Sequence, residues 1–281
     1  MKFGINTFLF ASPFKNEHTS FFDDFKEWGF DSVEVVVEED GDSDPSFVKD
    51  ELDKRGLTCA SMCGAFGPGR DLRGTPSEQR DTIDYIKRRI DMMEVLDTEY
   101  FVGPIYSAVG RTELCTESER KEHWQAVVKN LQELGHYAAE RGKKLGVEPL
   151  NRFETDFLNS CEQGMRLVED VGNPAVRLHL DTFHMNIEEK DPVAAVRQAG
   201  DLLGHFHACG TDRGTPGNDH MDWAGIGQAL KDIGYDGQVV IESFTEDVKV
   251  IARAASIWRK FEPDKRDIAR DGVQFLRKTF G

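Results

Sequence analysis

The sequence contains little that would mark a secreted, membrane-bound or nucleotide-binding protein. Its five cysteines are odd in number and form no Cys-x-x-Cys pair, which favours a reduced, cytoplasmic setting over a disulfide framework. Apolar runs such as Val35-Val36-Val37 are short, whereas a helix that spans a bilayer needs about 20 apolar residues. Residues 1–10 lack the basic and small-residue segments of a signal peptide, so we expect a mature chain.

Basic residues are also scarce. Lys and Arg total 35 against 51 for Asp and Glu, which gives a formal net charge of −16. A field of this sign repels nucleic acid, anionic membranes and, more weakly, phosphorylated substrates. We therefore expect a neutral small molecule as the partner, and neither nucleic acid nor a membrane.

Two patterns do alternate along the whole chain. Stretches with apolar residues at helical spacing, such as Phe21, Phe22, Phe25 and Trp28, separate short runs rich in β-branched and aromatic residues. Those runs lie at residues 2–8, 32–38, 57–63, 100–105, 144–149, 176–180, 203–208 and 238–244. Repeated strand–helix units predict a parallel sheet, either closed into a barrel or extended as a doubly wound sheet.

The absence of a nucleotide-binding signature helps to choose between these two folds. No Gly-x-Gly-x-x-Gly or P-loop motif follows the first strand, and no linker divides the chain. We therefore predict an α/β fold, a (β/α)8 TIM barrel in which residues 1–281 form a single domain. Two helical patterns follow the last strand, at residues 248–261 and 267–280. The second is expected to be an extra C-terminal helix that packs outside the barrel or against a partner subunit.

Ionisable residues stand at the ends of four consecutive predicted strands: Glu148, Asp181, His207 and Glu242. The carboxyl ends of barrel strands form the active-site face, so these side chains should converge there. Three buried carboxylates would repel one another unless a cation lay between them. Oxygen-rich ligation favours Mn²⁺, Co²⁺ or Mg²⁺ over Zn²⁺. Each residue alone is as well explained by a cap or a salt bridge, but the set predicts a metal site.

Two more histidines lie on the same predicted strands. His205 points to the same side as His207, and His179 to the same side as Asp181, because side chains two positions apart on a strand share a face. Each is either a ligand or a support residue. Since the inner layers of such barrels are mostly apolar, we interpret His205 as a hydrogen-bonded support residue and leave both histidines out of the site.

A long loop at residues 64–74 combines several glycines with Arg70 and Arg73. Such a loop either cradles a phosphate or covers the mouth of the barrel. The acidic balance of the chain favours the covering role.

Three segments resemble the ketose 3-epimerases, the D-tagatose/D-psicose 3-epimerase group of the xylose-isomerase-like barrels. They read Val147-Glu148-Pro149-Leu150-Asn151-Arg152-Phe153-Glu154, Leu180-Asp181-Thr182-Phe183-His184-Met185-Asn186-Ile187-Glu188-Glu189 and Gly204-His205-Phe206-His207. The resemblance extends over essentially the whole chain. It implies a metal-dependent epimerase of free ketoses, with Mn²⁺ as the first choice of cofactor and Co²⁺ or Mg²⁺ as alternatives. We expect a homodimer or a homotetramer.

The resemblance also implies roles for individual residues. The metal ligands fall on the four strand-end residues named above, and two of them, Glu148 and Glu242, would act as acid and base across C3 of the sugar. Substrate-orienting roles fall on Glu154, His184 and Arg213. We expect Glu154 either to fix the tautomer of His184 or to bind a sugar hydroxyl directly.

Two segments depart from the family pattern. The sequence Gly210-Thr211-Asp212-Arg213 stands where the family usually has Glu-x-Asn-Arg, and Glu242-Ser243-Phe244 stands where it commonly has Glu-Pro-Phe. Arg213 is expected either to close over the sugar from a flexible loop or to form a surface salt bridge with Asp212 or Asp219. The preferred sugar stays open.

These residue types suit proton transfer at a carbon beside a ketone. Binding of the ketone oxygen and the neighbouring hydroxyl to a cation would stabilise the enediolate that forms when a carboxylate removes the proton. Inversion then needs a second acid on the opposite face of the carbon. Aldose–ketose, hydroxypyruvate and inosose isomerisation begin in the same way and remain alternatives. Less favoured are an endonuclease, which would need more metals and histidines, and a non-catalytic sugar-binding barrel.

Overall fold

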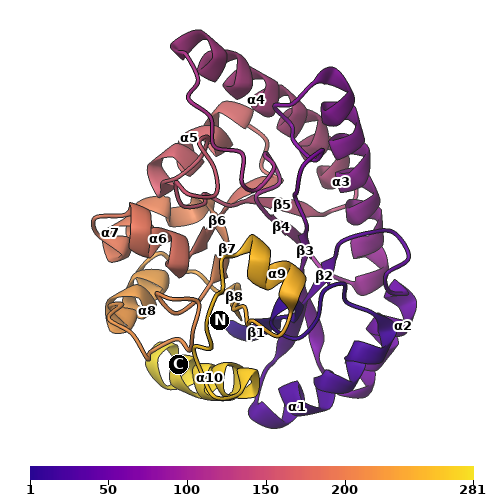
Figure 1. Ribbon diagram of the computed structural model, residues 1–281, viewed down its shortest axis with the longest axis vertical. Coiled ribbons are helices and arrows are strands. Elements are labelled where there is room, and N and C mark those ends of the chain that lie inside the picture. The colour runs from indigo at the N-terminus through magenta and orange to yellow at the C-terminus, as the bar shows by residue number, and fades with distance from the viewer.

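The computed structural model describes residues 1–281, and its eight strands close into one parallel barrel in chain order. Figure 1 looks down this barrel. Each strand begins within one residue of the start of a predicted run, so the TIM-barrel prediction is confirmed. The strands are β1 (Lys2–Asn6), β2 (Ser32–Val37), β3 (Thr58–Gly64), β4 (Tyr100–Gly103), β5 (Lys144–Val147), β6 (Val176–Asp181), β7 (Leu203–His207) and β8 (Gln238–Ile241).

A ring of helices surrounds the barrel, and two short helices are added at the carboxyl ends of the strands (Figure 1). The short ones are α6 (Thr182–Glu188) and α9 (Lys249–Ala254). The ring consists of α1 (Phe21–Trp28), α2 (Pro45–Lys54), α3 (Pro76–Leu96), α4 (Glu117–Ala139), α5 (Cys161–Val171), α7 (Pro192–Ala199), α8 (Trp223–Asp232) and α10 (Lys265–Phe280). No helix is both long and apolar enough to cross a membrane.

Local side-chain chemistry sets where many of these helices begin and end. Thr75 and Glu78 form a capping box at the start of α3, and Thr116 and Glu119 form another at the start of α4. Each box satisfies backbone N–H groups that have no partner inside the helix. Helix α1 ends at Gly29, whose φ of +97° lies in the left-handed region that glycine adopts without strain.

The region after β8 differs in part from the prediction. The helix expected over residues 248–261 ends at Ala254, because Ser256 adopts a left-handed φ of +58° and the Ile257 N–H donates to the Ala252 carbonyl. This bond closes the helix end in the manner of a Schellman motif. The C-terminal helix α10 is present and packs outside the strands, where it contacts α1 and α8 and completes the ring.

The apolar interior has two parts. A cluster of 61 buried residues fills the space between the strands and the surrounding helices. A second, separate cluster lies at the mouth of the barrel and joins α9 to the strand ends. Its members are Phe8, Val36, Cys63, Val102, Phe244, Ala252 and Ile257. The polar site described next lies beside this second cluster.

Candidate active site and metal centre

The four strand-end residues predicted as ligands meet at the carboxyl end of the barrel. Asp181 and His207 are the last residues of β6 and β7, while Glu148 and Glu242 directly follow β5 and β8. One ligand atom from each lies within 4.8 Å of the others, and all four residues are buried. The barrel closure therefore brings together side chains that are far apart in the sequence.

The two glutamates of this cluster have opposite electrostatic environments. Burial and the nearby negative charge of Glu242 raise the pKa of Glu148 well above its ordinary value. Burial also acts to raise the pKa of Glu242, but His207 and Arg213 outweigh it and leave that pKa lowered. The pKa values of the two carboxyls are thus shifted in opposite directions, as in sites where one carboxyl acts as an acid and another as a base.

Arg213 lies inside the site rather than at the surface. Its side chain is buried, and Nη1 donates to Asp181 Oδ2 at 2.7 Å and to Glu242 Oε2 at 3.0 Å. The guanidinium also lies over the rings of Phe183 and Phe244, with 4.1 and 4.8 Å between Cζ and each ring centre. The alternative of a surface salt bridge to Asp212 or Asp219 is therefore wrong.

His184 and Glu154 are connected through Asn151 and not directly. The Asn151 backbone N–H donates to His184 Nδ1 at 3.0 Å, and the Asn151 side-chain amide donates to Glu154 Oε1 at 2.7 Å. His184 Nε2 lies 3.1 Å from Arg213 Nη2, which can only donate, and 3.7 Å from Glu148 Oε1. The expectation that Glu154 itself fixes the His184 tautomer is corrected, and Asn151 was missed by the sequence analysis.

The donor set fits a divalent cation. His207 Nδ1 and Glu148 Oε1 are both buried without a hydrogen-bond partner, although both face the shared space between the strand ends. A buried polar atom without a partner is costly, and a cation would satisfy both atoms. Three carboxylates and one imidazole form a set that suits Mn²⁺, Co²⁺ or Mg²⁺.

Directly beneath this cluster lies Glu34, in the middle of β2, which the sequence analysis did not single out. It is fully buried and lies 2.9 Å from Nε2 of both His205 and His207. His205 is thus hydrogen-bonded inside the barrel, as interpreted from the sequence. The available signal was a lone carboxylate in the β-branched run Val33-Glu34-Val35-Val36-Val37.

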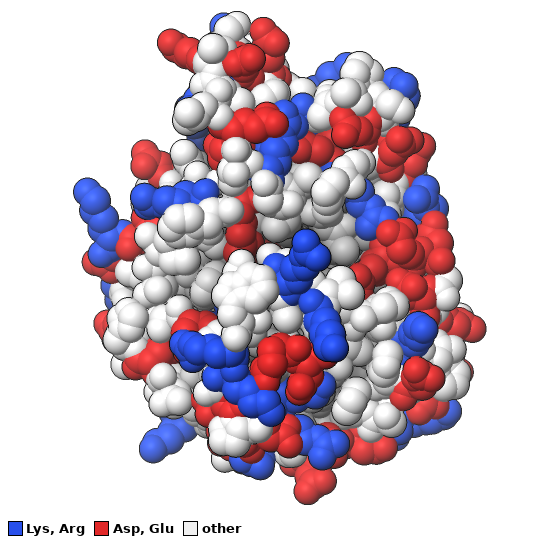
Figure 2. All heavy atoms as spheres, in the orientation of Figure 1, with Lys and Arg blue, Asp and Glu red and all other residues white.

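The arginines of the loop at residues 64–74 are used within the protein. Arg70 donates to the backbone carbonyls of Glu38 and Ala65, and Arg73 pairs with Asp156 at 2.5 Å. Neither is free to cradle a phosphate, which argues against that alternative for the loop. In Figure 2, basic side chains on this face are scattered among acidic ones rather than gathered in one patch.

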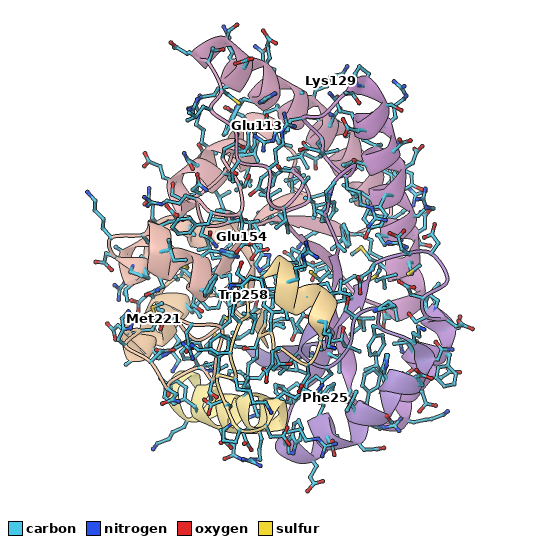
Figure 3. The ribbon with its side chains drawn as sticks, in the orientation of Figure 1. Phe25, Glu113, Lys129, Glu154, Met221 and Trp258 are labelled. Carbon is cyan, nitrogen blue, oxygen red and sulfur yellow. The ribbon has the colours of Figure 1, made fainter.

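Helix α9 and the turn after it partly cover the mouth of the barrel (Figure 1). Ala252 and Ile257 pack into the mouth cluster beside Phe8 and Phe244, whereas Trp258 remains 75% exposed. Figure 3 labels Trp258 and Glu154, which both project near the centre of this view.

Comparison with known proteins first defines the class. The family model for the xylose isomerase-like TIM barrel matches residues 22–279. A probable ketose 3-epimerase of Synechocystis is 36% identical over 100% of this chain and 97% of its own length. A D-psicose 3-epimerase of Enterocloster bolteae is 31% identical over 100% of this chain and 96% of its own length.

A solved structure is similar over the same extent. The D-allulose 3-epimerase from Methylomonas, in complex with D-allulose, superposes with a TM-score of 0.93 at 26% identity and covers 99% of this chain and 97% of its own. The chain thus belongs to the ketose 3-epimerase family of the xylose isomerase-like TIM barrels.

Proposed function

We propose that this protein inverts C3 of free ketoses and depends on one divalent cation, with Mn²⁺ as first choice and Co²⁺ or Mg²⁺ as alternatives. The observation that carries the proposal is the pair Glu148 and Glu242, which follow β5 and β8 on separate sides of the mouth and whose pKa values are shifted in opposite directions. An epimerase needs such a pair, because a proton returned to the face it left regenerates the substrate.

The chain's own residues supply both proton transfers. The ionised carboxylate of Glu242 takes the proton from C3, and the electrons of the broken C–H bond pass into the enediolate of the sugar. Glu148 then gives its proton to the opposite face of C3. In the reverse direction Glu148 is the base and Glu242 the acid. A bound cation, held by Glu148, Asp181, His207 and Glu242, would stabilise the negative charge that develops on the sugar oxygens.

The surrounding polar side chains support orientation of a sugar. His184 presents Nε2 towards the space beside Glu148, and Arg213 presents its guanidinium between Asp181 and Glu242. Glu154, held by Asn151, lies next to them at the mouth. We propose that these three side chains, Glu154, His184 and Arg213, bind the hydroxyl and carbonyl oxygens and keep C3 between the two glutamates.

The charge distribution supports a neutral substrate. The formal net charge of −16 and the three carboxylates of the site oppose a phosphate group. The one buried cationic side chain at the site, Arg213, is already paired with two of these carboxylates. A free ketose therefore fits better than a sugar phosphate.

A substrate panel combined with metal analysis tests the proposal. The purified protein is analysed for bound metal, stripped with a chelator, reloaded with Mn²⁺, Co²⁺ or Mg²⁺, and incubated with free ketoses of four to six carbons and with their phosphates. We expect C3 epimers from free ketoses, as in conversion of D-fructose to D-allulose, and loss of activity after stripping. Formation of aldoses as the main products would instead identify an aldose–ketose isomerase.

A further inference from the structure

Glu34 has four hydrogen-bonding groups around its carboxylate and no contact with solvent. Oε1 accepts from the Asn6 amide at 2.6 Å and lies 2.9 Å from His207 Nε2. Oε2 lies 2.9 Å from His205 Nε2 and accepts from the Ser61 hydroxyl. The β2–β3 register shifts between Val33 and Glu34, an irregularity that re-aims a side chain at this position.

This arrangement determines where His207 carries its ring proton. A carboxylate oxygen only accepts, so Nε2 must be the protonated nitrogen that donates to Glu34. In the neutral ring, which is the form that binds a metal, the other nitrogen, Nδ1, then carries a lone pair. It has no hydrogen-bond partner and lies 3.5 Å from Glu242 Oε2, among the atoms of the metal cluster. Glu34 thus sets both the tautomer and the rotation of the ring.

Asn6 extends the same control to a second ligand. The Phe8 backbone N–H donates to Asn6 Oδ1 at 2.8 Å, which fixes the orientation of the amide. The Asn6 Nδ2 group therefore donates in two directions, to Glu34 at 2.6 Å and to Glu242 Oε1 at 3.3 Å. One amide connects the carboxylate beneath the site to a carboxylate within it.

We propose that Glu34 is a positioning residue of the metal centre: it holds His207 with Nδ1 facing the cation, and through Asn6 it holds Glu242. This inference rests on the proposed metal-dependent function. Removal of a carboxylate that orients a ligating histidine in this way typically lowers metal affinity, because the ring is then free to rotate or to move its proton to the other nitrogen. Glu34 itself does not touch the substrate or the reacting carbon.

Two substitutions separate this role from simple packing. Glu34→Met keeps a similar volume but removes both acceptors, and we expect Mn²⁺ affinity to fall about 10- to 100-fold. Glu34→Gln keeps one carbonyl oxygen, which can face Asn6 and His207, while its NH₂ group faces Ser61 and a His205 ring that accepts on Nε2. We expect this conservative variant to recover most of the lost affinity. Mn²⁺ binding is measured directly, by the decrease in the electron paramagnetic resonance signal of free Mn²⁺ on titration.

Glu38 supplies the matched control. It is the first residue after β2, four positions beyond Glu34, and accepts from the Ser12 hydroxyl at 2.7 Å rather than from a histidine. Glu38→Met and Glu38→Gln should each leave Mn²⁺ affinity within about twofold of the original. Thermal unfolding in the presence of a chelator checks that every variant is folded. If Glu34 had only a structural role, its substitution would lower the unfolding temperature without changing the Mn²⁺ affinity of the folded protein.

The outcomes are distinguishable. Failure of the unsubstituted protein to bind Mn²⁺, Co²⁺ or Mg²⁺ would overturn the proposed function and this inference with it. Binding by the unsubstituted protein together with equally tight binding by Glu34→Met would overturn only the inference. If Glu34→Met does not fold, the inference is tested on the unsubstituted protein. The imidazole ¹⁵N chemical shifts, measured with Mg²⁺ and without metal, show which nitrogen of His207 carries the proton. A His207 ring protonated on Nε2 supports the inference, and one protonated only on Nδ1 overturns it.

Discussion

Ser243 lies in one of the two segments where this chain departs from the family pattern, and the structure gives it a specific contact. Its hydroxyl is buried and donates to the Arg213 carbonyl at 2.6 Å. Arg213 has a left-handed φ of +69°, which is unfavourable for a residue with a side chain. The Ser243 hydroxyl therefore stabilises the backbone that aims the guanidinium at Asp181 and Glu242.

Removal of that hydroxyl should weaken substrate binding more than it weakens the fold. For Ser243→Ala we expect KM for the best ketose to rise about fivefold, as for the loss of one hydrogen bond of about 1 kcal/mol. Steady-state kinetics at saturating Mn²⁺ measures the change. Thr82→Ala is the control, because that buried hydroxyl also donates to a backbone carbonyl, that of Glu78, but within helix α3. An unchanged KM in Ser243→Ala would show that Arg213 is held by other contacts.

The proposed acid–base roles of Glu148 and Glu242 are also tested by single substitutions. Replacing either with glutamine removes a proton-transferring group, so we expect epimerisation to fall by roughly 10²- to 10⁴-fold for Glu148→Gln and for Glu242→Gln. Nuclear magnetic resonance in deuterated water follows incorporation of deuterium at C3, and metal content is measured in parallel because both side chains are proposed ligands. Normal deuterium incorporation by Glu242→Gln would contradict its role as a base.

Residues at strand ends were predictable from the sequence, and residues inside strands or acting through a neighbour were not. Glu148 and Glu242 stand out because they directly follow apolar runs, where burial makes a carboxylate costly. Glu34 lies within such a run, and the inward direction of its side chain depends on barrel closure. Asn151 touches His184 only because the loop after β5 folds against α6, which residue spacing does not reveal.

At the scale of elements, the strands and their order followed from the sequence, but the segment after β8 did not. Apolar residues in 248–261 have helical spacing, yet the chain leaves the helix at Ser256 so that Ile257 can pack on the mouth cluster. That choice depends on tertiary contacts with Phe8 and Phe244, which outweigh local propensity. The result is a short segment over the barrel mouth, residues 249–258, which we call the cover, rather than a long helix.

This cover should open independently of the barrel. Ile257 belongs to the small mouth cluster and not to the large core, so Ile257→Ala should loosen residues 249–258 with little effect on global unfolding. We expect faster amide hydrogen exchange in that segment and a rise in KM of about tenfold or less. Val250→Ala, on the 64% exposed Val250 of the same helix, should change neither. Unaltered exchange in Ile257→Ala would mean that the cover is held elsewhere.

At the scale of the whole molecule, the polar centre creates a link between cation binding and stability. The protein buries Glu148, Asp181 and Glu242 beside one another, and burial raises the pKa of Glu148 and of Asp181. Arg213 compensates part of this charge through its two ion pairs. The remaining repulsion is a cost that the folded barrel bears and the unfolded chain does not.

A cation that binds only the folded state removes this cost. At a free Mn²⁺ concentration about 100 times its dissociation constant, the gain is about 2.7 kcal/mol, which for a chain of this size raises the unfolding temperature by roughly 5 °C. Calorimetry with Mn²⁺ and then with excess chelator measures the difference. NaCl at equal ionic strength controls for screening of the net charge of −16, and His207→Gln should abolish most of the Mn²⁺ effect. Identical unfolding temperatures with Mn²⁺ and with chelator would contradict a metal centre at these strand ends, because ligands buried in the folded barrel and separated in the unfolded chain cannot bind a cation without stabilising the fold.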